Sequence, residues 1–260
     1  MNLLRGILMT HYVLITTKDR LNLLNNCVES IRRTTPESRI FIVSDGSRSD
    51  TIDYITNSDY FEGYVINKTN IGIAPSIEIG INLINNYHRF RFNEGKEKDE
   101  DPFISYVQDD VEFIVSDWPK VLNNARLGIS LLSDMGQGEF KIGFTTGHVA
   151  PEHSNSIVGE YNLSNGYRIQ LRNHIRATHM EAPMSFWMQQ FPVSEVDPEQ
   201  RDGLRGHPGN SRGSNIDWWF LRDHPKSVLQ QGMTNLVVSG ILKHVGFDHS
   251  TWQSRPLQEV

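Results

Sequence analysis

The stretch Phe103–Phe113, which reads FISYVQDDVEF, decides the fold of this chain. Its apolar, β-forming residues predict a buried strand that ends at the adjacent acids Asp109 and Asp110. Two carboxylates at the end of an apolar strand are costly unless a cation neutralises them, and hard divalent cations bind carboxylate oxygens. Ligands of open α/β sheets lie just beyond the carboxyl ends of the strands. The sequence therefore predicts a metal and phosphate site here, and a solvated acidic turn is the alternative.

Strands and helices alternate on both sides of this stretch. The predicted strands are 11–17, 39–44, 63–66 and 141–146, and the predicted helices are 21–33, 51–56, 74–87 and 118–132. This alternation is typical of βαβ units, so we expect an α/β fold with a mostly parallel central sheet flanked by helices. Residues 92–102 are predicted to form a charged surface loop. After Gly147 the predicted strands are short, and residues 194–215, rich in Gly, Pro, Arg and Asp, predict a mobile loop.

The composition excludes several classes of protein. The 260 residues suffice for one large domain, and no apolar run approaches the roughly 18 residues of a membrane-spanning helix. The N-terminus has no signal-peptide cleavage site, so we expect a soluble, cytoplasmic protein. A net charge of −6 argues against a general binder of polyanions. The single cysteine, Cys27, excludes an internal disulfide and is predicted to lie in the core.

Three motifs occur in a characteristic order: VSDGSRSDT at Val43–Thr51, NIGIAPSIEIGIN at Asn70–Asn82 and VQDDVEF at Val107–Phe113. In this order and spacing the chain resembles the family-2 glycosyltransferases of the GT-A fold, most strongly over residues 11–117. The resemblance implies one Rossmann-like GT-A domain over residues 1–260. About residues 10–117 would bind the nucleotide sugar, and about residues 118–260 would form a subregion that binds the acceptor.

The resemblance also implies an activity and roles for single residues on the donor side. The activity is inverting, metal-dependent transfer of a sugar from a nucleotide-diphosphate sugar, expected to be a UDP-sugar, to an acceptor hydroxyl. Thr16 and Arg20 would lie beside the nucleobase and ribose, and Asp45 would bind the base. Asn70 and Gly72 would begin the helix that covers the nucleotide sugar.

The remaining roles implied by the resemblance concern the metal and the chemistry. Asp109 would contact the ribose or sugar, Asp110 and His244 would bind Mn²⁺ or Mg²⁺, and Asp217 would be the catalytic base. Val111 stands where many members of the family have a third acid, which leaves Asp110, with Glu112 as a second candidate, to bind the metal.

The sequence departs from the family again before the helix that carries the base. The family has a Glu-Asp pair there, whereas this chain reads Ser214-Asn215-Ile216-Asp217. One alignment register places Asn215 at the position of the base. Asp217 is preferred, because an amide cannot accept a proton at neutral pH.

Other functions remain as alternatives. A nucleotidyltransferase would need a glycine-rich phosphate loop after the first strand, and TTKDRLN at residues 16–22 contains no glycine. A non-catalytic module that binds nucleotide sugars would not need the intact Asp109, Asp110 and His244. The acceptor is expected to be a glycan, a protein or, as in viral DNA-modifying transferases, a hydroxymethylated base of DNA that is flipped out of the duplex.

Overall fold

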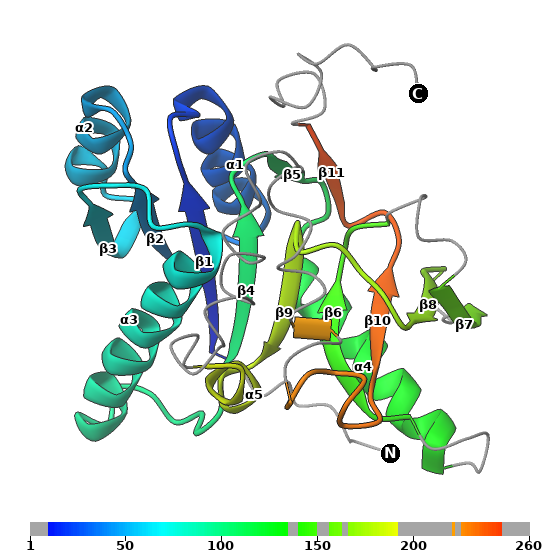
Figure 1. The fold of residues 1–260 in the computed structure, drawn as a ribbon. Helices are drawn as coiled ribbons and strands as arrows, with labels where there is room; N and C mark the ends of the chain where they lie inside the picture. Colours follow the sequence, from blue (N-terminus) through cyan, green and yellow to red (C-terminus); the bar gives the residue numbers. More distant parts are fainter. Residues whose placement is uncertain are drawn as a thin grey trace.

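The apolar runs of the sequence form the strands of a single nine-stranded sheet with helices on both faces (Figure 1). A computed structural model of the protein describes residues 10–134, 140–149, 156–162, 166–191, 220–221 and 225–245. The strands of the sheet are β1 (His11–Thr17), β2 (Arg39–Asp45), β3 (Phe61–Asn67), β4 (Phe103–Gln108), β6 (Ile142–Thr146), β7 (Ile157–Asn162), β8 (Arg168–Arg172), β9 (His179–Pro183) and β10 (Thr234–Val238). A separate two-stranded sheet joins β5 (Val111–Phe113) to β11 (Leu242–His244). The helices are α1 (Leu21–Thr34), α2 (Ser49–Asn57), α3 (Ile73–Asn93), α4 (Trp118–Asp134) and α5 (Met184–Gln189).

The order of the strands is β3-β2-β1-β4-β9-β6-β10-β8-β7. β1 is parallel to β2 and β4, β2 is parallel to β3, and β6 is parallel to β10. β9 is antiparallel to β4 and β6, and β8 is antiparallel to β10 and β7. Seven of the nine strands therefore run in one direction and only β8 and β9 run in the other. The expectation of an α/β fold with a mostly parallel sheet is confirmed.

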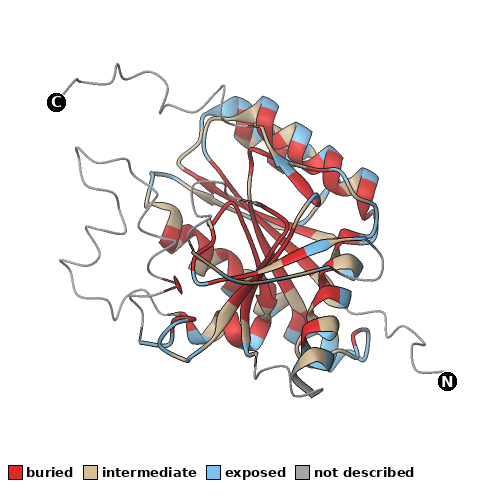
Figure 2. Ribbon diagram, turned by 90° about the vertical axis from the view of Figure 1, so that its right-hand side faces the viewer, coloured by how far each residue is buried: buried red, intermediate tan, exposed pale blue. Residues whose placement is uncertain are grey.

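Successive side chains of each strand point to opposite faces of the sheet, and each face is covered by different helices. In β1, Leu14 packs into the cluster that contains Ile77 of α3, whereas Ile15 packs into the cluster that contains Val28 of α1. Cys27 is fully buried in the second cluster, as predicted. The sheet interior and the helix faces that contact it are accordingly buried (Figure 2). Among the described helices, none is both long and apolar enough to cross a lipid bilayer.

A charged loop is confirmed over residues 94–102, most of which are exposed, but the prediction for residues 92–102 is wrong at its start and at Glu97. Helix α3 continues to Asn93, and Glu97 is only 8% exposed. Glu97 forms ion pairs with Arg39 and with Arg91, the latter at 3.1 Å. These cations offset the cost of burying a carboxylate, and they hold the pKa of Glu97 below its ordinary value although burial acts in the opposite direction.

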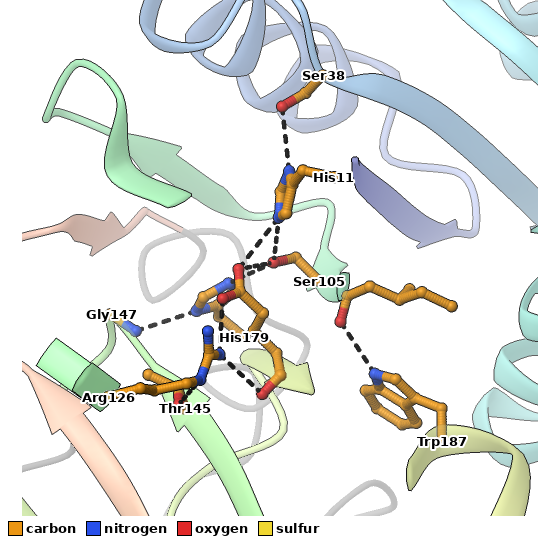
Figure 3. Close-up of polar contacts among 10 residues, drawn as sticks. His11, Ser38, Ser105, Arg126, Thr145, Gly147, His179 and Trp187 are labelled. Carbon is orange, nitrogen blue, oxygen red and sulfur yellow. Dashed lines mark hydrogen bonds and ion pairs between the residues drawn. The ribbon is translucent and has the colours of Figure 1, made fainter. Parts of the chain in front are cut away.

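A second buried acid, Glu181, lies in the middle of the sheet. β9 places Glu181 between Ser105 of β4 and Thr145 of β6, so three strands contribute polar side chains to one row. Ser105 Oγ donates to Glu181 Oε2 at 2.5 Å, and Arg126 of α4 donates to Glu181 Oε1 at 2.7 Å (Figure 3). His11 Nε2 lies 3.1 Å from Glu181 Oε2. Burial favours the protonated acid, but Arg126 and His11 outweigh it and hold the pKa of Glu181 well below its usual range.

His179 extends this network towards the loop after β6. Its Nδ1 accepts a hydrogen bond from the Gly147 backbone N–H at 3.0 Å, so the proton of the neutral ring must be on Nε2. Nε2 lies 3.4 Å from Ser105 Oγ, to which it donates (Figure 3). Burial lowers the pKa of His179 to about 3 and keeps the ring neutral. The Ser105 hydroxyl therefore joins His179 to Glu181, and His11 Nε2 also lies 3.0 Å from Ser105 Oγ.

We expect the Ser105→Ala substitution to lower the free energy of unfolding by about 1–3 kcal/mol, the range for leaving a buried polar group without its partner. The substitution removes the acceptor of the His179 N–H and one donor to Glu181. Unfolding in urea, followed by far-ultraviolet circular dichroism, measures the difference.

Ser76→Ala is the matched control for this measurement. Ser76 is also fully buried, but its hydroxyl has no hydrogen-bond partner among the described residues. Its removal should leave stability unchanged or slightly raise it, because it deletes an unpaired polar group. Equal losses for the two variants would show that the network contributes nothing beyond side-chain packing.

Candidate functional site

The candidate site lies where the connections of the sheet change direction. The chain proceeds from β1 outwards to β2 and β3, and α3 then returns it to β4 on the other side of β1. α1 and α3 pack on opposite faces, so the chain segments that follow β1 and β4 flank a switch point. Open α/β sheets bind their ligands at such switch points, beyond the carboxyl ends of the strands. Thr17 ends β1 and Arg20 follows it at this position, and Asp109 and Asp110 stand there after β4.

The acid pair is buried rather than solvated. Asp109 is fully buried and Asp110 is 4% exposed, so the alternative of a solvated acidic turn is wrong. Thr17 Oγ1 donates to Asp109 Oδ2 at 2.6 Å. Arg20 contacts both acids: its Nε lies 3.3 Å from Asp109 Oδ2, its Nη2 pairs with Asp109 Oδ1, and its Nη1 lies 2.8 Å from Asp110 Oδ2. One guanidinium group therefore neutralises part of the charge of two carboxylates.

Burial is the largest influence on the pKa of each carboxyl group, because it disfavours the charged form. It raises the pKa of Asp109 to about 6, against the opposing effects of Arg20 and Thr17. For Asp110, His244 and Arg20 outweigh burial and hold the pKa below its ordinary value. Neighbouring positive charge and hydrogen bonds thus determine whether the pair remains ionised.

The small β5–β11 sheet brings the C-terminal part of the chain to the acid pair. β11 pairs His244 with Val111, the residue that follows Asp110. His244 Nε2 lies 3.4 Å from Asp110 Oδ1, and the Val245 backbone N–H donates to the Asp110 carbonyl oxygen at 2.8 Å. The structure therefore brings together two residues that are 134 positions apart and that the sequence resemblance assigned to the same metal.

Asp110 and His244 have the right chemistry for a divalent cation, since carboxylate oxygen and imidazole nitrogen are common ligands of Mn²⁺, and Mg²⁺ is held through carboxylates. Within the described ranges, no group of three His, Cys, Asp or Glu side chains could hold a metal ion. Glu112 does not join them, because it pairs with Arg33 at 3.1 Å on the surface. The described residues thus fit a site with two protein ligands, of the kind that substrate phosphates and water complete.

A second set of predicted residues connects the end of β2 to the turn after β3: Asp45, Asn70 and Gly72. Both carboxylate oxygens of Asp45 accept backbone N–H groups, from Ile71 at 2.8 Å and from Gly72 at 3.0 Å. Asn70 Oδ1 also accepts the Gly72 N–H, at 2.9 Å. Gly46 has φ +73°, and a Cβ atom there would lie 2.5 Å from the Asn70 nitrogen, so only glycine fits. Asp45 therefore fixes the start of α3, and its remaining lone pairs are what it can offer a ligand.

The other predicted residues are placed as follows. Thr16 Oγ1 lies 3.1 Å from the hydroxyl of Tyr106 on the neighbouring strand, beneath the switch point. Arg20, expected beside the nucleobase and ribose, contacts the acid pair. Asp217 and the loop 194–215 lie outside the described residues.

Thr17 and His148 also belong to the site, although neither was expected from the sequence. Thr17 holds Asp109, and the His148 ring lies 5.7 Å from the His244 ring, measured between centroids. Both residues stand at or just after the carboxyl end of a strand, on the same edge of the sheet as Asp109. That position is the signal by which they could have been found.

Comparisons with known proteins identify similar folds only at low sequence identity. No protein-family model matches the chain, and no curated protein sequence matches it. A structure of TarS residues 1–349 from S. aureus is 11% identical, with 90% of this chain and 58% of that chain covered and a TM-score of 0.47. A mannosyltransferase from Pyrobaculum calidifontis, in complex with GDP-Man and Mn²⁺, is 11% identical, with 90% and 57% covered and a TM-score of 0.46. The galactosyltransferase LgtC is 12% identical, with 81% and 70% covered and a TM-score of 0.38.

The chain thus spans less than two thirds of the TarS and mannosyltransferase chains. At this level of similarity, a function has to be argued from the residues of the site itself.

Proposed function

We propose that the protein is a glycosyltransferase that moves a sugar from a nucleotide-diphosphate sugar to an acceptor hydroxyl. The observation that supports this most directly is the buried pair Asp109 and Asp110 at the switch point between β1 and β4, with Arg20 and His244 gathered against it. Such a site combines ligands for a cation, from the acids and His244, with the positive charge of Arg20. It suits a reaction in which negative charge develops on a diphosphate leaving group.

On the donor side, the proposal assigns the nucleoside to the turns after β1, β2 and β3. Asp45 orders the Asn70–Gly72 turn through two backbone hydrogen bonds, so this wall of the site is rigid before a ligand binds. Preorganised walls bind with a smaller loss of conformational entropy. Asp45 would use its free lone pairs to accept a hydrogen bond from the base, and the family-2 resemblance makes a UDP-sugar the expected donor.

Asp110 and His244 are the residues that would hold Mn²⁺ or Mg²⁺. When bound, such a cation acts as a Lewis acid that stabilises charge on the departing diphosphate. Thr17 would keep the Asp109 carboxylate fixed beside the sugar or ribose. Asp217, proposed from the sequence, would deprotonate the acceptor hydroxyl as its oxygen attacks the anomeric carbon from the face opposite the diphosphate, and this single displacement would invert the configuration. The proposed acceptors are a glycan, a protein hydroxyl or a hydroxymethylated DNA base.

The test is a donor panel. UDP-, GDP- and other nucleotide sugars are incubated with the protein in Mn²⁺, in Mg²⁺ or in EDTA, and released nucleoside diphosphate is quantified. We expect hydrolysis of one class of donor that stops in EDTA. Mass spectrometry of acceptor mixtures then identifies the transferred sugar, and NMR of the first product gives its anomeric configuration.

Other outcomes would contradict the proposal in distinguishable ways. Pyrophosphate release from a nucleoside triphosphate and a sugar phosphate would indicate a nucleotidyltransferase. Binding of a nucleotide sugar without any turnover in either metal would indicate a binding module. Failure to bind any nucleotide sugar would remove the donor assignment altogether.

A further inference from the structure

Arg20 occupies the place at which a cation would neutralise the acid pair. It stands immediately before α1, and its backbone carbonyl accepts the Leu24 N–H at 2.9 Å, so its main chain is fixed by the helix. Its side chain is 36% exposed, whereas those of Asp109 and Asp110 are 0% and 6% exposed. The guanidinium therefore lies between the two buried carboxylates and solvent.

Arg20 and a divalent cation would need the same carboxylate. Nη1 of Arg20 lies 2.8 Å from Asp110 Oδ2, and His244 Nε2 lies 3.4 Å from the other oxygen of that carboxylate, Oδ1. A cation bound to Asp110 would stand against the guanidinium, and like charges repel strongly where water is largely excluded. The guanidinium on Oδ2 therefore weakens the binding of a cation between Oδ1 and His244.

The other contacts of the pair do not depend on Arg20. Thr17 Oγ1 donates to Asp109 Oδ2 at 2.6 Å, and the Val245 N–H holds the Asp110 carbonyl oxygen at 2.8 Å. These bonds would keep both acids in place if the long, partly exposed Arg20 side chain turned away. A guanidinium released at the mouth of the site is well suited to a diphosphate, which it can bind through two hydrogen bonds at once.

We propose that Arg20 competes with a divalent cation for Asp109 and Asp110, and that the cation displaces it onto the diphosphate of the nucleotide. The displacement by the cation stands on the geometry alone, whereas the transfer to a diphosphate rests on the proposed function. Arg20 is thus a positioning residue that exchanges an internal partner for a ligand.

The experiment measures binding rather than turnover. Titration calorimetry of Mn²⁺ without nucleotide compares the wild type with Arg20→Ala. We expect the variant to bind Mn²⁺ at least about tenfold more tightly, as it should if Arg20 leaves the pair free in no more than about a tenth of the molecules. With Mn²⁺ saturating, UDP and GDP should bind the variant roughly tenfold or more weakly than the wild type, because a charge-assisted contact is lost.

Two further variants serve as controls for this comparison. Arg33→Ala removes a guanidinium that pairs with Glu112 on the surface and is 61% exposed, so it should change neither affinity. Arg20→Gln keeps a hydrogen-bond donor without the charge, in case Arg20→Ala folds poorly. Mn²⁺ should raise the melting temperature of either Arg20 variant more than that of the wild type, because a tighter ligand of the folded state stabilises it more.

Each outcome decides a separate point. Mn²⁺ affinity in the Arg20 variants that is equal to or weaker than that of the wild type would overturn the competition. Tighter Mn²⁺ binding with unchanged nucleotide affinity would overturn the transfer of Arg20 to the diphosphate. Tighter Mn²⁺ binding in a protein whose wild type binds no nucleotide would support the competition and contradict the proposed function.

Discussion

The Asp110→Ala substitution should reduce sugar transfer by at least about a thousandfold, since Lewis-acid stabilisation of several kcal/mol corresponds to a rate factor of that size. Asp110 is the acid that faces both Arg20 and His244, so its removal deletes the carboxylate of the proposed metal site. The fold should persist, because Arg20 keeps its contacts with Asp109 and the repulsion between two buried acids is relieved. Steady-state kinetics, Mn²⁺ titration and a melting curve measure the three effects.

Glu112→Ala is the matched control in the same motif. Glu112 is an acid two residues further along, but it pairs with Arg33 at the surface. Its loss should leave transfer and Mn²⁺ affinity close to those of the wild type. If Glu112→Ala abolished Mn²⁺ binding and Asp110→Ala did not, the metal would be bound on the other side of β5. If Asp110→Ala were inactive only because it failed to fold, the assignment would also lose its support.

The N-terminal half of the fold was predictable because its signals are local. The β-branched runs of β1 and β2 and the helical spacing in α1 each lie within one element, and the turns between them carry Asp19 and Pro36. The central prediction, an acid pair at the end of a buried strand, follows from the same kind of signal. What a short apolar run predicts is which residues are buried, and the full burial of Ile104, Tyr106 and Val107 bears this out.

Contacts between distant parts of the chain were not predictable in this way. β5 and β11 have three residues each, too few for a periodic pattern, and they stabilise one another only when paired. The ion pair of Glu181 with Arg126 joins residues 55 positions apart. Glu97 was misplaced for the same reason: its charged neighbours suggested a solvated loop, whereas Arg39 from a distant strand makes its burial possible.

Within the site, Arg20 shows what the sequence alone does not determine. The sequence places it in the turn after β1, at the mouth of the expected crevice, and the structure agrees. A long side chain at that position can reach either a ligand or the acids behind it, and no pattern in the turn distinguishes the two. The distances to Asp109 and Asp110 show that the side chain reaches the acids.

The Asp217→Asn substitution should lower turnover by about 10²–10⁴-fold, the usual contribution of a general base. Asp217 follows the Gly- and Arg-rich residues 194–215 in the sequence. Phe220, three residues later in the sequence, is fully buried and packs against Trp187 of α5, with ring centroids 5.5 Å apart. An amide of nearly the same shape preserves contacts but cannot accept the proton. Metal and donor affinities should therefore stay at wild-type values while the maximal rate falls.

Asn215→Ala decides between the two alignment registers of this segment. If Asp217 is the base, Asn215→Ala should reduce turnover far less than Asp217→Asn, because an amide at residue 215 takes no proton in the reaction. The pH dependence adds a second criterion, since loss of a general base removes the acidic limb from the profile of the maximal rate. Asp217→Asn should lose this limb and Asn215→Ala should keep it. Near-normal turnover in Asp217→Asn, with a severe loss in Asn215→Ala, would make Asp217 a structural residue and shift the alignment of the C-terminal half by two positions.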